Sequence, residues 1–215
     1  GERAGDGDGR KDGDGDGEAG GGEESLTEAE ILEREERLER ARGLKLAGNQ
    51  LFAAHNYAGA AARYTEAIEE CPEGHREGAV FYNNRATCFF KMGDHDRVVQ
   101  DCSAALRLDP DYTKCLLRRA QAYEMQKKLA DAYDDFQKVV KLDGSNSIAL
   151  AASRRLEGPA KEEREKQKEE MMGKLKDLGN SVLGRFGMSL DNFKTVQDPN
   201  TGSYSISYNP GGGGE

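Results

Sequence analysis

Five polar side chains at recurring helical spacings are the residues in this sequence best suited to bind a ligand. They are Lys45 and Asn49, then Asn84, then Lys114 and Arg118. The first two are four positions apart, as are the last two, so on a helix each pair projects from one face. Lys and Arg donate charged hydrogen bonds and amides add neutral donors, so the set suits two neighbouring carboxylates, such as the end of a peptide that terminates in Asp. Asn is also a poor residue inside a helix, which indicates a role beyond local propensity for both asparagines.

An internal repeat indicates which elements carry these side chains. Large, small and terminating residues recur at matching offsets in three units that start at residues 41, 79 and 113. Repeat units of this length are typical of paired antiparallel helices that stack side by side. In such a stack the first helix of each pair lines the concave face. Small residues let neighbouring helix backbones approach one another. The residues that we assign to packing are Gly48, Ala60, Ala86, Ala120 and Cys102.

Four segments follow from this repeat and from composition. Residues 1–25 form an acidic Gly/Asp tract that we predict to be disordered, because it has almost nothing apolar to bury. We predict a lead-in helix over residues 26–40, and the three units with a capping helix over residues 41–157. Residues 158–215 are predicted to hold a charged, then amphipathic helix and a small hairpin. The predicted fold class is therefore all-α, a short right-handed solenoid of three helix pairs with a capping helix, followed by a C-terminal helix and a β-hairpin.

The C-terminal helix carries an apolar stripe with two interpretations. We expect Gly158 and Pro159 to end the capping helix, and we expect a new helix to begin after them. The stripe of that helix consists of Met171, Met172, Leu175, Leu178 and Val182. It is expected to dock back on the repeats, and the alternative is an exposed face for a partner or a membrane.

Charge and cysteine usage exclude several classes of function. The net charge of −9 opposes general binding to nucleic acid or to an anionic membrane. The acidic run from Asp12 to Glu23 matches a calcium-loop pattern, but a Gly-Asp repeat produces such matches by accident, so we predict neither a metal nor a cofactor. Four widely spaced cysteines, no apolar stretch of 18 residues and no glycosylation sequon favour a cytoplasmic location without stable membrane insertion.

Three short motifs carry a resemblance to a known family. They are Leu44-Lys45-x-x-Gly48-Asn49, Asn83-Asn84-Arg85-Ala86 and Lys114-x-x-x-Arg118-Arg119-Ala120. Together they resemble the dicarboxylate-clamp class of tetratricopeptide repeat (TPR) proteins. Residues 173–180 and 201–206 add a wider resemblance to one TPR subfamily, and that wider resemblance covers about residues 26–208. The resemblance to the clamp class implies three TPR units, a clamp formed by the five residues named first, and binding to the acidic C-terminal tails of Hsp70 or Hsp90.

Two functions remain open at this point. The first is a non-catalytic co-chaperone or adaptor that recruits Hsp70 or Hsp90, as the resemblance implies. The second keeps the fold but makes the main partner a signalling or trafficking protein, for example a GTPase, bound through the C-terminal amphipathic helix. No phosphate-binding loop, nucleophile elbow or zinc-protease motif is present, so we do not predict an enzyme.

Overall fold

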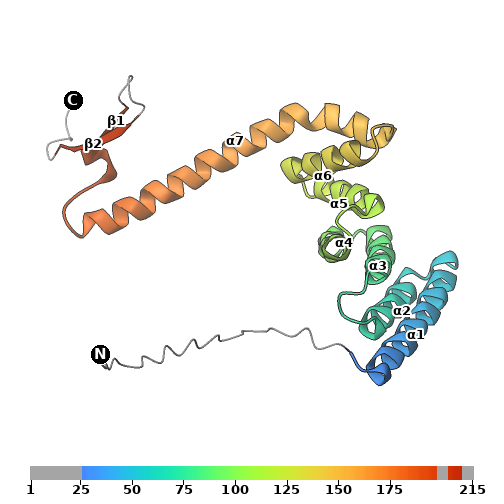
Figure 1. The fold of residues 1–215 in the computed structure, drawn as a ribbon. Coiled ribbons are helices and arrows are strands. Elements are labelled where there is room, and N and C mark those ends of the chain that lie inside the picture. The colour runs from blue at the N-terminus through green and yellow to red at the C-terminus, as the bar shows by residue number, and fades with distance from the viewer. Residues whose placement is uncertain (1–25, 198–202, 210–215) are drawn as a thin grey trace, which may run out of the picture.

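A computed structural model describes residues 26–197 and 203–209 of the 215-residue chain (Figure 1). Within these residues it contains seven α-helices, one short 3-10 helix and two strands. The α-helices are α1 (Glu28–Ala53), α2 (Tyr57–Glu70), α3 (Gly78–Met92), α4 (His95–Leu108), α5 (Thr113–Met125), α6 (Leu129–Leu142) and α7 (Ser147–Gly184). The predicted disordered tract and the calcium-loop pattern lie outside the described residues.

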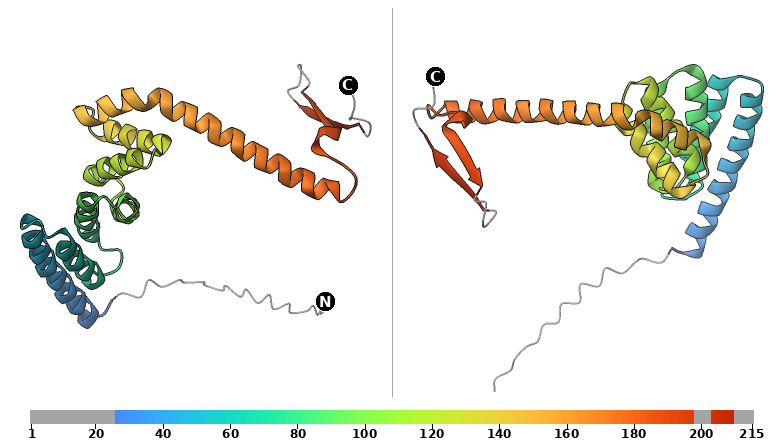
Figure 2. Two further views of the ribbon diagram at one scale, coloured as in Figure 1. Left: turned by 180° about the vertical axis from the view of Figure 1, so that it is seen from behind. Right: turned by 90° about the horizontal axis from the view of Figure 1, so that it is seen from above.

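The first six helices form three pairs that stack in chain order into a curved solenoid (Figures 1 and 2). Turns of two or three residues separate the members of each pair, and local capping explains two of them. The Asn56 side chain accepts a hydrogen bond from Gly59 N, which starts α2, and Asp94 accepts one from Arg97 N, which starts α4. Gly93 ends α3 with a positive φ of 79°, a conformation that favours glycine. The predicted all-α solenoid of three helix pairs is confirmed.

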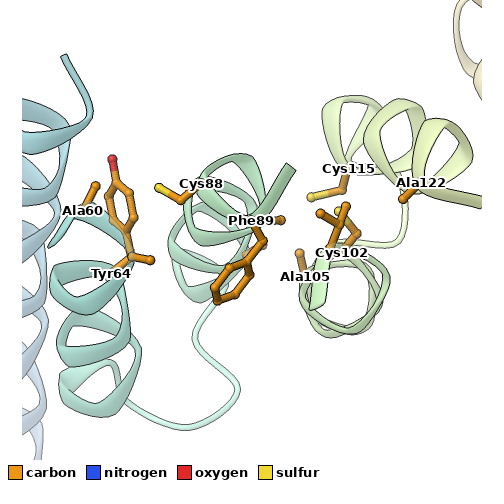
Figure 3. Close-up of a cluster of buried hydrophobic side chains, with 12 residues drawn as sticks. Ala60, Tyr64, Cys88, Phe89, Cys102, Ala105, Cys115 and Ala122 are labelled. Atoms are coloured by element: carbon orange, nitrogen blue, oxygen red, sulfur yellow. The ribbon is translucent and has the colours of Figure 1, made fainter. Parts of the chain in front are cut away.

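Small residues and aromatic rings build the core, as the repeat predicts. A Cβ atom at Gly48 would lie 2.7 Å from Cε1 of Tyr64, so a side chain there would collide with that ring. Ala60, Ala86 and Ala120 have no exposed surface. Figure 3 shows how the rings and thiols of successive helices meet across the solenoid. Burial of these apolar groups supplies the main driving force for stacking the pairs.

Two arginine–aspartate pairs lie 34 residues apart along the solenoid. Arg85 on α3 donates two hydrogen bonds to Asp101 on α4, at 2.9 and 2.8 Å. Arg119 on α5 donates two to Asp135 on α6, at 2.8 and 2.7 Å. Each guanidinium also reaches a hydroxyl on the preceding pair, Thr65 for the first and Ser103 for the second. The contacts with aspartate hold the two helices of one pair together, and the contacts with a hydroxyl fix the register between neighbouring pairs.

The separate lead-in helix is not observed, because residues 26–40 and the first helix of the first unit form one continuous α1. Thr27 and Glu30 form a capping box at its start. The charged first half then follows α2, since Arg37 donates to the carbonyl of Glu69 and Arg40 to the carboxylate of Glu70.

The predicted break at Gly158 and Pro159 is wrong, because α7 runs through both residues without interruption. Proline removes one backbone hydrogen bond and normally ends or kinks a helix. Here tertiary contacts hold both sides of it against α6. Leu156 and Ala160 are buried, and beyond them the Glu163 carboxylate accepts a hydrogen bond of 2.8 Å from Ala130 N.

The prediction that the stripe of α7 docks on the repeats is also wrong. The helix continues straight past the last pair and projects away from the solenoid (Figures 1 and 2). Its five stripe residues are 54–64% exposed. Amphipathic spacing shows that one face is apolar, but it does not determine what covers that face.

Beyond α7 the chain turns back and forms the predicted hairpin. The 3-10 helix η1 (Leu190–Asn192) contacts α7, with Lys176 paired to Asp191 at 2.9 Å. Strand β1 (Phe193–Gln197) then pairs antiparallel with β2 (Tyr204–Tyr208), in a register that sets Phe193 opposite Tyr208. None of the helices that the structure describes combines the length and apolar character needed to cross a membrane.

The two ends of α7 should respond differently to loss of a leucine side chain. We expect Leu156→Ala to lower the free energy of unfolding by roughly 3 kcal/mol, because this side chain is 3% exposed and packed in the core. We expect Leu178→Ala to change it by less than about 0.5 kcal/mol, because this side chain is 64% exposed. Urea unfolding followed by circular dichroism measures both, and equal losses would mean that the stripe packs on the repeats after all.

Candidate peptide-binding site

The five residues predicted to bind a ligand lie on the first helix of each pair. Lys45 and Asn49 are on α1, Asn84 is on α3, and Lys114 and Arg118 are on α5. Asn49 and Lys114 are exposed, and the other three are half-buried. Within residues 26–197 and 203–209 no hydrogen bond or salt bridge joins any two of the five. What each side chain can offer a ligand therefore depends on its own surroundings.

Asn49 is oriented by the tyrosine that also fills the core of the first unit. The Tyr64 hydroxyl donates a hydrogen bond of 2.7 Å to Asn49 Oδ1. Burial raises the pKa of Tyr64 to about 12, so its hydroxyl stays protonated and acts as a donor. Because the carbonyl oxygen of the amide is engaged, the NH2 group is the part of Asn49 that can donate to a ligand.

Lys45, in the preceding turn of α1, keeps its charge available. Its charge acts on the carboxylate of Glu77, but Arg42 already binds both oxygens of that carboxylate. That hydrogen bonding lowers the pKa of the Glu77 carboxyl, and Lys45 contributes only a smaller effect. The ammonium group of Lys45 makes no salt bridge with any described residue.

Arg118 differs from Arg85 on α3 and from its neighbour Arg119 on α5 in the partner that holds it. Arg85 and Arg119 each give two hydrogen bonds to a buried aspartate, which neutralises their charge. Arg118 instead donates from Nη1 to Oδ1 of Asn83, a neutral acceptor. A guanidinium has five N–H donors, so this contact leaves most of them, and the full positive charge, for a ligand.

Lys114 and Asn84 complete the set without partners of their own among the described residues. Lys114 lies in the first turn of α5, four positions before Arg118, so the two cations project from one face of that helix. Asn84 lies on α3 next to Asn83, whose oxygen contacts Arg118. The hydrogen bond from Arg118 to Asn83 therefore joins α5 to α3, the helix that carries Asn84.

Sequence reasoning missed the supporting roles of Tyr64 and Asn83. Tyr64 stands at one of the large-residue offsets of the first unit, and nothing in its position along the chain reveals the hydrogen bond to Asn49. Asn83 was only part of a motif, although a second asparagine inside the same helix was a signal that could have drawn attention to it.

A separate recess of about 300 Å³ lies beside the first inter-pair loop, which joins α2 to α3. It is lined in part by Cys71, Tyr82 and Leu108, but by none of the five ligand-binding candidates. In the part of the chain that the structure describes, no cluster of His, Cys, Asp or Glu side chains has the arrangement of a metal site.

Comparison with known proteins identifies the architecture. The tetratricopeptide repeat family model matches residues 79–112, the second helix pair and the loop after it. The solved Arabidopsis OM64 TPR domain is 30% identical in sequence, with a TM-score of 0.51, and the match covers 56% of this chain and 96% of that domain. The chain belongs to the tetratricopeptide repeat family.

Other members of the TPR family show what related domains bind. The first TPR of Spaghetti (RPAP3), solved with the HSP90 peptide SRMEEVD, is 28% identical with a TM-score of 0.52, and the match covers 57% of this chain and 94% of that one. The second TPR domain of human RPAP3, solved with the HSP70 peptide SGPTIEEVD, is 26% identical with a TM-score of 0.50, and the match covers 58% of this chain and 98% of that one.

The curated relatives are much longer than the matched region. Mouse sperm-associated antigen 1 is 40% identical over 118 residues, which are 53% of this chain but 13% of that protein. The match therefore spans about half of this chain and a small part of the longer protein.

Proposed function

We propose that this chain is a non-catalytic TPR adaptor, of the co-chaperone type, that binds acidic C-terminal peptides through a dicarboxylate clamp. The clamp consists of Lys45, Asn49, Asn84, Lys114 and Arg118. The observation that carries the proposal is the state of Arg118, which is held by a neutral amide while Arg85 and Arg119 are neutralised by aspartates.

The chemistry of the ligand follows from the donors. A peptide that ends in Asp presents its terminal carboxylate and its side-chain carboxylate within a few ångströms of each other. Removing both from water is costly unless they gain charged partners and several hydrogen bonds. Three cations and two amides on successive first helices meet that requirement, whereas a set of neutral donors would not.

The source of the peptide is suggested by the related domains. Two of the solved TPR domains hold HSP90 or HSP70 peptides that end in Glu-Glu-Val-Asp. We infer that the C-terminal tails of Hsp90 and Hsp70 are the ligands here as well. All four cysteines are free, which supports a reducing compartment, and we place the adaptor in the cytoplasm. Residues 173–180 and 201–206 also resemble the tail of tetratricopeptide repeat protein 1, and we infer that the chain is of that subfamily.

Fluorescence anisotropy of a labelled SRMEEVD peptide tests the proposal. We expect a dissociation constant of about 1 µM, which corresponds to a favourable binding free energy of about 8 kcal/mol. The affinity is no higher because ordering a flexible tail offsets much of the contact energy. Affinity should fall as salt is raised, since the contacts are charged. A folded protein that does not bind the peptide at low salt would overturn the proposal.

The exposed stripe of α7 favours a second binding role on the same chain. Next to the stripe, a recess of about 460 Å³ is lined by Met172, Gly173, Leu175, Lys176 and Leu190. Exposed apolar patches of this kind mark surfaces that contact other molecules. A signalling or trafficking protein such as a GTPase is the partner that we propose for it. Leu175→Glu with Leu178→Glu should abolish that contact and leave peptide affinity unchanged.

A further inference from the structure

Asn83 is a buried polar residue whose side chain connects two helices of different repeats. It lies on α3 and is 6% exposed. Its Oδ1 atom accepts hydrogen bonds from Nη1 of Arg118 and, at 3.4 Å, from Sγ of Cys115, both on α5. One oxygen therefore ties the first helix of the second unit to the first helix of the third.

The position of this oxygen matters because it provides the acceptor that holds the guanidinium of Arg118. A long, flexible arginine must lose rotamer freedom when it binds a ligand, and a side chain already held in place loses less. A neutral acceptor can provide that restraint without cancelling the charge that a carboxylate ligand needs. Arg85 and Arg119 show the alternative, in which a buried aspartate holds the guanidinium and neutralises its charge.

We propose that Asn83 is a positioning residue for the clamp, one that holds the Arg118 guanidinium ready for a ligand carboxylate while leaving its positive charge intact. The inference rests on the proposed function, because it gives Asn83 a purpose only if Arg118 meets a carboxylate. It adds a residue outside the five clamp positions and assigns it to one of them.

Two substitutions at Asn83 separate its restraining role from its neutrality. Asn83→Leu keeps a side chain of similar size and removes the acceptor, so Arg118 is no longer held. We expect the affinity for the labelled SRMEEVD peptide to fall about tenfold. Asn83→Asp keeps the acceptor but makes the contact an ion pair. We expect a loss at least as large, together with a weaker dependence on salt, because one cation of the clamp is neutralised.

A double-mutant cycle distinguishes this role from a general structural one. If Asn83 acts through Arg118, Asn83→Leu should change affinity less than about twofold when Arg118→Ala is already present. An equal loss in both backgrounds, or tighter binding by Asn83→Leu alone, would overturn the inference. Circular dichroism and the melting temperature verify folding of each variant, and Asn83→Ser, which is smaller and also neutral, replaces Asn83→Leu in the cycle if that variant does not fold.

The same titrations separate failure of this inference from failure of the proposed function. If wild-type protein does not bind the peptide, the proposed function fails, and the inference with it. If wild-type protein binds, Arg118→Ala weakens binding and Asn83→Leu does not, then the clamp stands and the role of Asn83 is refuted.

Discussion

Replacing Arg118 with Ala is expected to weaken binding of an acidic C-terminal peptide about 30-fold, a loss of roughly 2 kcal/mol. The physical reason is that a ligand carboxylate would lose its charged partner at a half-buried position. The solenoid should remain folded, because Arg118 donates a single hydrogen bond to residues that the structure describes, and Cys115 still donates to the same oxygen of Asn83. Anisotropy with the labelled peptide measures the loss, and circular dichroism verifies the fold.

Arg107 on α4 provides the matched control for this substitution. It is exposed, lies on the second helix of its pair, and lines the recess beside the first inter-pair loop instead of the clamp. Arg107→Ala removes the same charge from the protein, but from outside the clamp. It should therefore change peptide affinity by less than about twofold. Similar losses for the two variants would indicate that total charge attracts the peptide and that the clamp geometry is irrelevant.

The second large effect concerns stability, and two adjacent aspartates on α6 allow a direct comparison. Asp135 is paired with Arg119, and its side chain is 8% exposed, whereas the side chain of Asp134, paired with Arg164, is 65% exposed. We expect Asp135→Ala to lower the free energy of unfolding by about 3 kcal/mol, because it leaves a half-buried arginine without its partner. Asp134→Ala should cost less than about 1 kcal/mol, since exposed ion pairs contribute little. Urea unfolding of both variants tests this, and equal losses would contradict it.

The buried pair should be more important for register than for net stability. Burial raises the pKa of the Asp135 carboxyl even though Arg119 is bonded to it, so desolvation opposes the attraction between the two charges. Replacing both residues with apolar ones of similar size should therefore cost less than Asp135→Ala alone. A double replacement that is more destabilising than the single one would show that the charges themselves stabilise the fold.

The repeat architecture was predictable because it depends on residues close in sequence. Small residues such as Gly48 and Ala86 stand at the same offset in successive units, where neighbouring helices pack closely. The break at Pro159 was wrongly predicted because the rule for proline is local. Contacts across space, such as Glu163 with the backbone of Ala130, outweigh the single hydrogen bond that proline removes.

The candidate site was predictable as a set of positions but not as a set of contacts. Helical spacing places Lys114 and Arg118 on one face of α5 from sequence alone. Which neighbour holds Arg118 depends on how α3 lies against α5, and a neutral Asn83 and a charged aspartate at that point would give opposite properties to the same cation. Sequence spacing within one helix does not carry that information.

The most direct test of the clamp is a competition measurement with two unlabelled peptides that differ only at the C-terminus. The labelled SRMEEVD peptide is displaced from the protein by the same sequence as a free acid, and separately by its C-terminal amide. A dicarboxylate clamp predicts that the free acid competes at about micromolar concentration and that the amide is at least about tenfold weaker, because it lacks one of the two carboxylates. Equal displacement by the two peptides would contradict the account, since the protein would then not recognise the terminal carboxylate.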